Sequence, residues 1–260
     1  MKYTVMKWDN TKPMRLPVLL AAVFLPSSIA FFGFHVILPR IVASGMPVIL
    51  AWPLVASVML SGLIVFAFWR LNREAREMDV SLKKRLCLIK VKGKDWGITA
   101  ALVVLILILS GPMTKLSVML LNAFNITVPE YLPFFLNPRI DAMTAGMDQL
   151  SPGLDLSGQY WIILPVLFTI ILNVLTEDLY FRAWMLPKMH TYGKMAWLLN
   201  GFLFASYHTF QIWLFPVLII ASCAMAFITQ KSRSIIPCLV VHFLINVGMA
   251  AVSMIMLIGK

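Results

Sequence analysis

Charged side chains are scarce in this chain. Only 13% of its 260 residues are Asp, Glu, Lys or Arg, against about 25% in a typical soluble domain. Hydrophobic residues make up 60% of the chain. This balance excludes an ordinary water-soluble domain. It predicts a single membrane-embedded domain over residues 1–260, located in the cell membrane as a multi-pass protein.

Acidic residues are the scarcer of the two charged classes: 11 Asp and Glu face 22 Lys and Arg, so the formal net charge is +11. Such an excess can indicate a nucleic-acid partner, but no RNA- or DNA-binding motif is visible. The basic residues lie between the apolar runs, where they set membrane topology and contact anionic lipid. We therefore expect the lipid bilayer, and no nucleic acid, as a partner.

Cysteine is also rare. The chain has three, Cys87, Cys223 and Cys238, an odd number at irregular spacing. This excludes a disulfide framework and a zinc ribbon.

What the chain has instead is a series of long apolar runs. A helix needs about 20 apolar residues to cross the hydrocarbon core of a bilayer. The predicted fold class is therefore all-α, a polytopic transmembrane helical bundle of about seven spans. Gly111-Pro112 interrupts the third run, so an end near Ser110, followed by an interfacial helix, is an alternative to a single span there. An eighth, partial insertion is considered between residues 113 and 136. The predicted spans are 16–39, 47–69, 98–120, 160–182, 195–211, 213–230 and 234–257.

The connecting segments orient this bundle. Nine Lys and Arg lie between Arg70 and Lys94, whereas residues 111–159 hold few basic residues. The positive-inside rule then places the N-terminus in the cytoplasm and residues 111–159 outside. Residues 70–97 are expected to form a charged, solvated connector that lies on lipid headgroups.

Three clusters of polar side chains interrupt the apolar runs in the second half of the chain. Ionisable residues are costly inside a membrane, so they usually have a function or a partner. The clusters are Glu177, Asp178 and Arg182 in one span, His208 in the next, and His242 with Asn246 in the last.

The spacing within these clusters predicts which side chains share a face. Residues four apart lie on one side of an α-helix, so Asp178 is expected to pair with Arg182, and His242 projects beside Asn246. Glu177 points in another direction and needs a different partner.

The positions of these residues along their spans predict that the three clusters lie at similar depths in the membrane and can share one cavity. Counted from the basic cytoplasmic ends of their spans, Glu177, His208, His242 and Asn246 lie roughly 14–21 Å into the membrane. A glutamate beside an imidazole can hold a water molecule and take its proton. Imidazole and carboxamide N–H groups can stabilise the oxyanion that forms when an amide is attacked. The residues thus predict hydrolysis of a peptide bond.

The same residues resemble a known pattern. Glu-Asp-x-x-x-Arg, Phe-x-x-x-His and His-x-x-x-Asn, in this order on successive spans, look like the three motifs of the CPBP family. These are the CAAX proteases and bacteriocin-processing enzymes, also called the Abi family. Ser234-Ile-Ile-Pro-Cys resembles the usual lead-in to the last motif. The resemblance covers residues 160–250, and the first 110 residues match only as generic spans.

The resemblance implies an intramembrane endopeptidase of the type II CAAX prenyl endopeptidase kind. Its substrate would be a peptide or membrane protein, lipidated in some members, that reaches the site from the cytoplasm. Glu177 would activate water together with His208, while His242 and Asn246 would form the oxyanion hole. Asp178, Arg182 and Phe204 would support the site, the last by packing.

Two departures from the family pattern concern the first motif. The family usually has a second glutamate where this chain has Asp178, and a glycine where it has Ala183. Aspartate keeps the charge but reaches less far, which puts its bracing role in doubt. Alanine at position 183 is small enough to be tolerated.

Alternatives remain open at the level of sequence. No cofactor is expected, but zinc accepts a His, His, Glu ligand set, here His208, His242 and Glu177. The commonest zinc-protease motif, His-Glu-x-x-His, is absent. A non-catalytic bacteriocin-immunity or scaffold protein is a second alternative. A proton-coupled transporter is a third, although no inverted repeat supports it.

Overall fold

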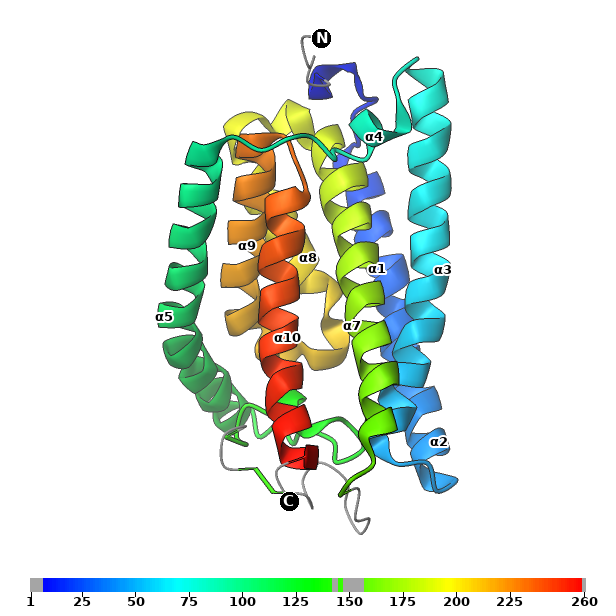
Figure 1. Ribbon diagram of the computed structural model, residues 1–260, viewed down its shortest axis with the longest axis vertical. Coiled ribbons are helices and arrows are strands. Elements are labelled where there is room, and N and C mark those ends of the chain that lie inside the picture. The colour runs from blue at the N-terminus through cyan, green and yellow to red at the C-terminus, as the bar shows by residue number, and fades with distance from the viewer. Residues whose placement is uncertain (1–6, 142–144, 147–156, 259–260) are drawn as a thin grey trace.

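The structure is a computed structural model that describes residues 7–141, 145–146 and 157–258. Secondary structure in this part of the chain is helical, and no strand occurs in it, so the predicted all-α fold is confirmed (Figure 1). The α-helices are α1 (Leu16–Phe32), α2 (Leu38–Ala43), α3 (Val48–Glu77), α4 (Leu82–Arg85), α5 (Gly93–Ala123), α7 (Ile163–Glu177), α8 (Ala196–Tyr207), α9 (Phe215–Ser232) and α10 (Ile236–Ile258). Two π-helical segments, η2 (Gly33–Ile37) and η5 (Asp178–Met185), and five 3₁₀ segments complete them: η1 (Trp8–Asn10), η3 (Phe134–Leu136), η4 (Tyr160–Ile162), η6 (Leu186–Met195) and η7 (Thr209–Leu214).

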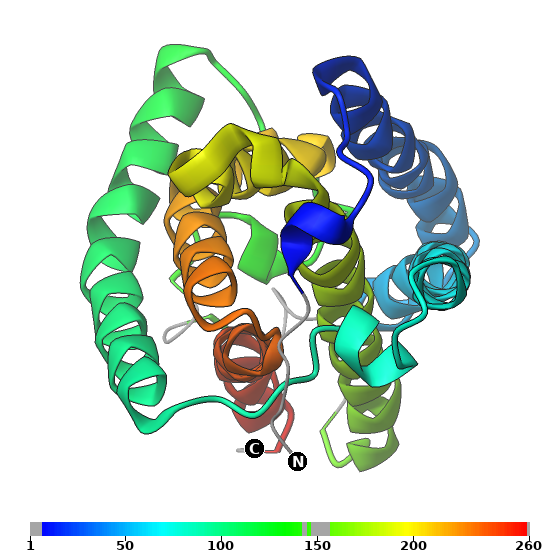
Figure 2. The same ribbon diagram turned by 90° about the horizontal axis from the view of Figure 1, so that it is seen from above.

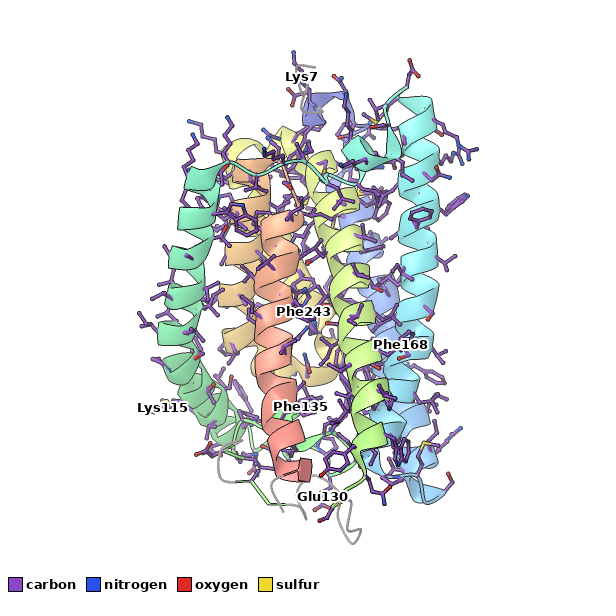
Figure 3. All side chains as sticks on the ribbon, viewed as in Figure 1. Lys7, Lys115, Glu130, Phe135, Phe168 and Phe243 are labelled. Carbon is purple, nitrogen blue, oxygen red and sulfur yellow. The ribbon has the colours of Figure 1, made fainter. Side chains whose placement is uncertain are left out.

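The described helices form a membrane-type bundle. Five continuous helical stretches are long and apolar enough to cross a bilayer, and a shorter apolar helix, Ile236–Gly248, accompanies them. They stand roughly side by side in Figure 1, and η1 and α4 lie at the opposite end from the segment that follows α5. The same separation appears in Figure 3, where Lys7 and Glu130 mark the two ends. This is the arrangement of a multi-pass membrane protein.

The arrangement around the bundle axis is seen from one end in Figure 2. Helix α7 packs against α3 on one side and against α10 on another, and α8 packs against α9. Helix α5 stands at the periphery against α9, with many of its apolar side chains exposed. The predicted catalytic residues thus come from α7, from the residue after α8 and from α10, and α10 packs against both α7 and α9.

The alternative end of the third span near Ser110 is wrong. Helix α5 continues through Gly111-Pro112 from Gly93 to Ala123, and it curves in its second half (Figure 1). Proline removes one backbone donor and clashes with the preceding turn, which bends a helix without having to end it. Residues 113–123 therefore belong to α5, and the described residues 124–136 form only turns and the short η3. No eighth insertion forms there.

The predicted fifth span, 195–211, also needs correction. Helix α8 has 12 residues and is about 18 Å long, less than the roughly 30 Å hydrocarbon core. The chain turns back through η7 inside the bundle (Figure 1). Phe210 and Trp213 of η7 pack in one cluster with Leu132 and Leu136, and the Trp213 Nε1–H donates to the Leu136 carbonyl at 2.7 Å. The segment after α5 thereby fills the space beneath the turn.

The connector after α3 is more than a solvated segment, contrary to the sequence prediction. Arg85 of α4 is completely buried. Its guanidinium donates to Glu74 Oε2 from Nε at 3.0 Å and Nη2 at 2.6 Å, and to the carbonyls of Ala183 at 2.6 Å and Trp184 at 3.4 Å. Lys188 also donates to Glu74. The connector is thus fixed to the end of η5, the segment that follows Glu177.

Candidate active site

Glu177 is the last residue of α7, and its side chain is 3% exposed. The helix around it is almost entirely apolar. Its polar residues after the first turn are Thr169, Asn173, Thr176 and Glu177. Residues 169, 173 and 177 are four apart, so they form one polar stripe along the helix. This stripe faces the protein interior at its Glu177 end and sets the position of the carboxylate.

His208 reaches this carboxylate from a break in the helix. Helix α8 ends at Tyr207, and His208 has non-helical backbone angles, φ −83° and ψ 47°. Its Nδ1–H donates to the Phe204 carbonyl at 2.9 Å, because a carbonyl can only accept. In the neutral ring, Nε2 is then unprotonated, and it lies 3.7 Å from Glu177 Oε1. The turn thus aims a proton-accepting nitrogen at the glutamate.

His242 reaches the other oxygen of the same carboxylate from α10. Its Nε2 lies 3.6 Å from Glu177 Oε2, and its Nδ1 lies 3.5 Å from Asp178 Oδ2. The Cys238 thiol donates to the second oxygen of Asp178 at 3.1 Å. The structure therefore brings Glu177, His208 and His242 together, with one imidazole at each oxygen of the glutamate.

Asn246 lies one helical turn from this group and has a different partner. Its Nδ2–H donates to Asn173 Oδ1 at 3.0 Å. Among the described residues, no hydrogen bond joins Asn246 to Glu177 or to either histidine. Sequence analysis missed Asn173, although a polar residue four positions before Glu177 in an apolar helix is a signal that could have found it.

The predicted pair between Asp178 and Arg182 does not form in the described structure. Arg182 is completely buried, and its guanidinium donates to Asn200 Oδ1 at 2.9 Å and to the Ser222 carbonyl at 3.3 Å. The two side chains are taken by other partners, because Asp178 faces His242 Nδ1 and accepts from the Cys238 thiol, while Arg182 points to Asn200 and the Ser222 carbonyl.

Arg182 supports the site by another route. Its guanidinium carbon lies 4.5 Å from the centre of the Phe204 ring, a cation–π arrangement. The Phe204 ring also packs edge-on against His208, with 4.9 Å between ring centres. Since the Phe204 carbonyl accepts from the same histidine, Phe204 holds His208 with its backbone and its ring. Arg182 thus steadies the turn that carries His208.

The donor groups do not fit a metal site. Among the described residues, no group of three or more His, Cys, Asp and Glu side chains is arranged to hold a metal ion. Instead, the two histidines face separate oxygens of Glu177.

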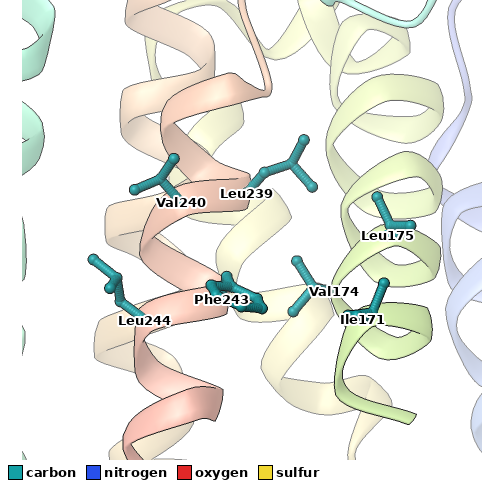
Figure 4. A pocket seen from close by; sticks show the side chains of 7 residues that line it. All are labelled: Ile171, Val174, Leu175, Leu239, Val240, Phe243 and Leu244. Atoms are coloured by element: carbon teal, nitrogen blue, oxygen red, sulfur yellow. The ribbon is translucent and has the colours of Figure 1, made fainter. Parts of the chain in front are cut away.

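A groove runs along the other side of the α7–α10 pair. It has a volume of about 330 Å³ and is lined only by apolar side chains (Figure 4). Residues from α7 border one side and residues from α10 the other. The lining residues are Ile171, Val174, Leu175, Leu239, Val240, Phe243 and Leu244. None of the polar residues of the site lines it, so the polar group and the apolar groove occupy different sides of the same helix pair.

Part of the chain, including the segment that carries the site, matches a known protein family. A model of the family "Type II CAAX prenyl endopeptidase Rce1-like" matches residues 159–248. This stretch begins at the start of α7 and extends into α10, so it contains all three elements of the site. No curated protein and no solved structure matches the chain. The match confirms the CAAX protease resemblance predicted from the sequence and supports an intramembrane endopeptidase in general. Residues 159–248 are therefore similar to the type II CAAX prenyl endopeptidase Rce1-like family.

Proposed function

We propose that the chain is an intramembrane endopeptidase in which Glu177 and His208 activate the water that hydrolyses a peptide bond. The observation that carries this proposal is the placement of one buried carboxylate between two imidazoles, at 3.7 Å and 3.6 Å. Three ionisable groups are costly to bury together in a membrane protein unless they have a function. Their arrangement suits proton transfer at a water molecule.

The separations at Glu177 suit a bridging water better than a direct hydrogen bond. A separation of 3.7 Å between His208 Nε2 and Glu177 Oε1 is too long for a direct hydrogen bond, and a bridging water suits such a gap. Both atoms accept hydrogen bonds, so the water would donate one proton to each. Its oxygen lone pair would then point away from both, toward the carbonyl carbon of a substrate.

The chemistry of the step follows from this placement. The water oxygen bonds to the carbonyl carbon while Glu177 takes a proton from it. The carbonyl oxygen becomes negative and is stabilised by N–H groups of His242 and Asn246. The Asp178 carboxylate, 3.5 Å from His242 Nδ1, favours a proton on that nitrogen. His242 therefore donates to the oxyanion from Nε2, in the form of the ring that carries a proton on both nitrogens. Collapse of the intermediate breaks the C–N bond, and Glu177 returns its proton to the leaving amine.

The substrate we propose is a peptide or a membrane-protein tail that enters from the cytoplasmic side. The family description names prenyl endopeptidases, so a prenylated tail is the form to test first. Two internally quenched peptides that differ only in a prenyl group on cysteine would decide it. Faster cleavage of the prenylated peptide would favour a lipidated substrate, and equal cleavage would favour an unmodified one.

The mechanism is tested by Glu177→Gln, which keeps the shape of the side chain but cannot take a proton. We expect cleavage of the quenched peptide in detergent to fall on the order of 10²–10⁴-fold. Glu130→Gln is the matched control, because this exposed glutamate lies at the far end of the molecule (Figure 3). It should cleave like the unmodified protein. Wild-type rates in Glu177→Gln would contradict the mechanism.

Chelation separates this mechanism from the zinc-dependent alternative. If Glu177 and His208 act without metal, prolonged treatment with a zinc chelator leaves the cleavage rate unchanged. Loss of activity that returns only on addition of zinc would instead establish a metalloprotease.

A further inference from the structure

Asn173 and Asn246 form a polar contact one turn from the carboxylate and imidazole of Glu177 and His242. Asn173 precedes Glu177 by four residues, and Asn246 follows His242 by four. The helices α7 and α10 therefore face each other with two polar contacts, about 6 Å apart along the axis. One is the Glu177–His242 approach at 3.6 Å, and the other is the hydrogen bond from Asn246 to Asn173 at 3.0 Å.

The hydrogen bond decides which end of the Asn246 carboxamide faces α7. Asn173 offers its carbonyl oxygen, so the Asn246 NH₂ group turns toward it and the Asn246 oxygen turns away. A carboxamide NH₂ has two donors. One is used by Asn173, and the described structure gives the other no protein partner. Both side chains are half-buried, so this second donor remains accessible to a ligand.

No side chain that lines the groove on the outer side of these helices can replace Asn173 as a hydrogen-bond acceptor. The groove on the outer side of α7 and α10 is lined by seven apolar residues. Without Asn173, the Asn246 carboxamide would lose its acceptor on α7 and could rotate about its last side-chain bond. An oxyanion donor must be fixed in place before the reaction, because reorientation during the step costs catalytic power.

We infer that Asn173 is a positioning residue of the active site: its carbonyl oxygen holds the Asn246 carboxamide so that the second N–H can donate to a carbonyl oxygen of the substrate. This inference rests on the proposed function. The opposing explanation is that the two asparagines only join α7 to α10, as polar side chains often do between membrane helices. The two explanations predict different kinetics.

The test is a double-mutant cycle on peptide cleavage with Asn173→Leu, Asn246→Leu and the double variant. Leucine keeps the branching of the asparagine side chain but has no polar atom, and it is larger. We expect Asn173→Leu to lower kcat about 10–100-fold with little change in KM, and Asn246→Leu to lower it about 100–1,000-fold. The double variant should equal Asn246→Leu, because Asn173 acts only through Asn246. Should Asn173→Leu fail to fold, Asn173→Ala takes its place in the cycle.

Thr169→Val is the matched control for a lost contact between helices. Thr169 lies two turns before Glu177 on the same stripe, and its hydroxyl hydrogen-bonds with Ser57 of α3 at 2.9 Å. The variant removes an interhelical hydrogen bond of α7 away from the site, so kcat should remain at the wild-type value. The melting temperatures of Thr169→Val and Asn173→Leu should fall by similar amounts.

Three outcomes overturn the inference. Wild-type kcat in Asn173→Leu would show that Asn246 needs no positioning. Losses of kcat that add in the double variant would show that Asn173 acts independently. A loss of kcat in Thr169→Val equal to that in Asn173→Leu would show a merely structural contact. If Glu177→Gln is inactive in the same assay, these results count against the Asn173 inference alone; if Glu177→Gln is fully active, the proposed function fails with it.

Discussion

Glu177 presents one oxygen to each of two imidazoles, and the protein holds the two rings in different ways. His208 is fixed by a backbone carbonyl, which leaves its Nε2 free to accept a proton. His242 faces a second carboxylate, Asp178, which favours a proton on its Nδ1. Two identical side chains thus receive opposite tasks from their neighbours, one as an acceptor and one as a donor. The Cys238 thiol donates to the other oxygen of Asp178 at 3.1 Å.

At the same scale, the Cys87 thiol should be chemically inert in the folded protein. Cys87 lies in the connector after α4 and is 1% exposed. Burial raises its pKa from 9.0 to about 11, although the neighbouring Arg85 opposes the shift. The thiolate is the reactive form, and a pKa higher by two units leaves about a hundredfold less of it at pH 8. We expect alkylation of Cys87 by iodoacetamide to be at least about a hundredfold slower than in unfolded protein.

Peptide mapping by mass spectrometry measures this rate for each cysteine separately. Because a raised pKa favours the neutral thiol, the rate in folded protein should still rise as the pH increases from 9 toward 11. The same protein unfolded in denaturant is the control, and its Cys87 should react like a free thiol. Equal rates in folded and unfolded protein would show that the connector is open to solvent.

At the scale of elements, the π-helical segment η5 is the least ordinary part of the fold. It joins α7 to the 3₁₀ segment η6, and such changes of helix type leave carbonyls without regular partners. Arg85 donates to two of them, on Ala183 and Trp184, from a different segment of the chain. Glu74 in turn accepts two hydrogen bonds from Arg85. The connector therefore caps the C-terminal end of η5, the element that begins directly after Glu177.

Arg85→Ala should for this reason be strongly destabilising. It removes the cap from two carbonyls and leaves the buried Glu74 with one fewer cation, and breaking a buried ion pair costs about 3–5 kcal/mol. Arg73→Ala is the matched control on α3, because Arg73 and Glu77 form an exposed ion pair at 2.7 Å, which contributes about 0–1 kcal/mol. Thermal unfolding in detergent should show a large drop for Arg85→Ala and a small one for Arg73→Ala. Similar drops would refute the capping role.

These elements also show what a sequence can and cannot predict. The apolar runs predicted α1, α3, α5 and α9, because helix length and hydropathy are local properties. The number of residues from the cytoplasmic end of each span predicted similar depths for Glu177, His208 and His242, and the structure brings these side chains together. The π-helical η5 could not be anticipated, because the residue that binds the carbonyls of Ala183 and Trp184 at its end, Arg85, comes from a distant segment of the chain.

The short α8 escaped prediction for a related reason. The composition of α8 is that of a helix that crosses the membrane. The helix ends early because the residues that follow it pack against the segment after α5. Asn173 stands four residues before Glu177, which was a signal in the sequence, but its partner Asn246 on another helix is visible only in the structure.

At the scale of the whole molecule, the distribution of charge predicts which end faces the cytoplasm. Lys7 and the connector after α3 lie at one end of the bundle, and the segment with Glu130 lies at the other (Figure 3). Nine basic residues lie between Arg70 and Lys94, in the last turns of α3, in this connector and at the start of α5. Basic segments stay in the cytoplasm during insertion. Because the described helices form one bundle with these ends well separated, a single orientation must hold for all of them at once.

Cysteine labelling in intact cells tests this orientation. Lys7 and Glu130 are both exposed in the structure, so Lys7→Cys and Glu130→Cys each place a reachable thiol at one end. With a maleimide that does not cross membranes, we expect Glu130→Cys to be labelled in intact cells and Lys7→Cys only after the membrane is opened. The unsubstituted protein gives the background of its own cysteines, of which Cys87 and Cys238 are buried. Labelling of Lys7→Cys in intact cells would reverse the orientation and move substrate entry to the other side of the membrane.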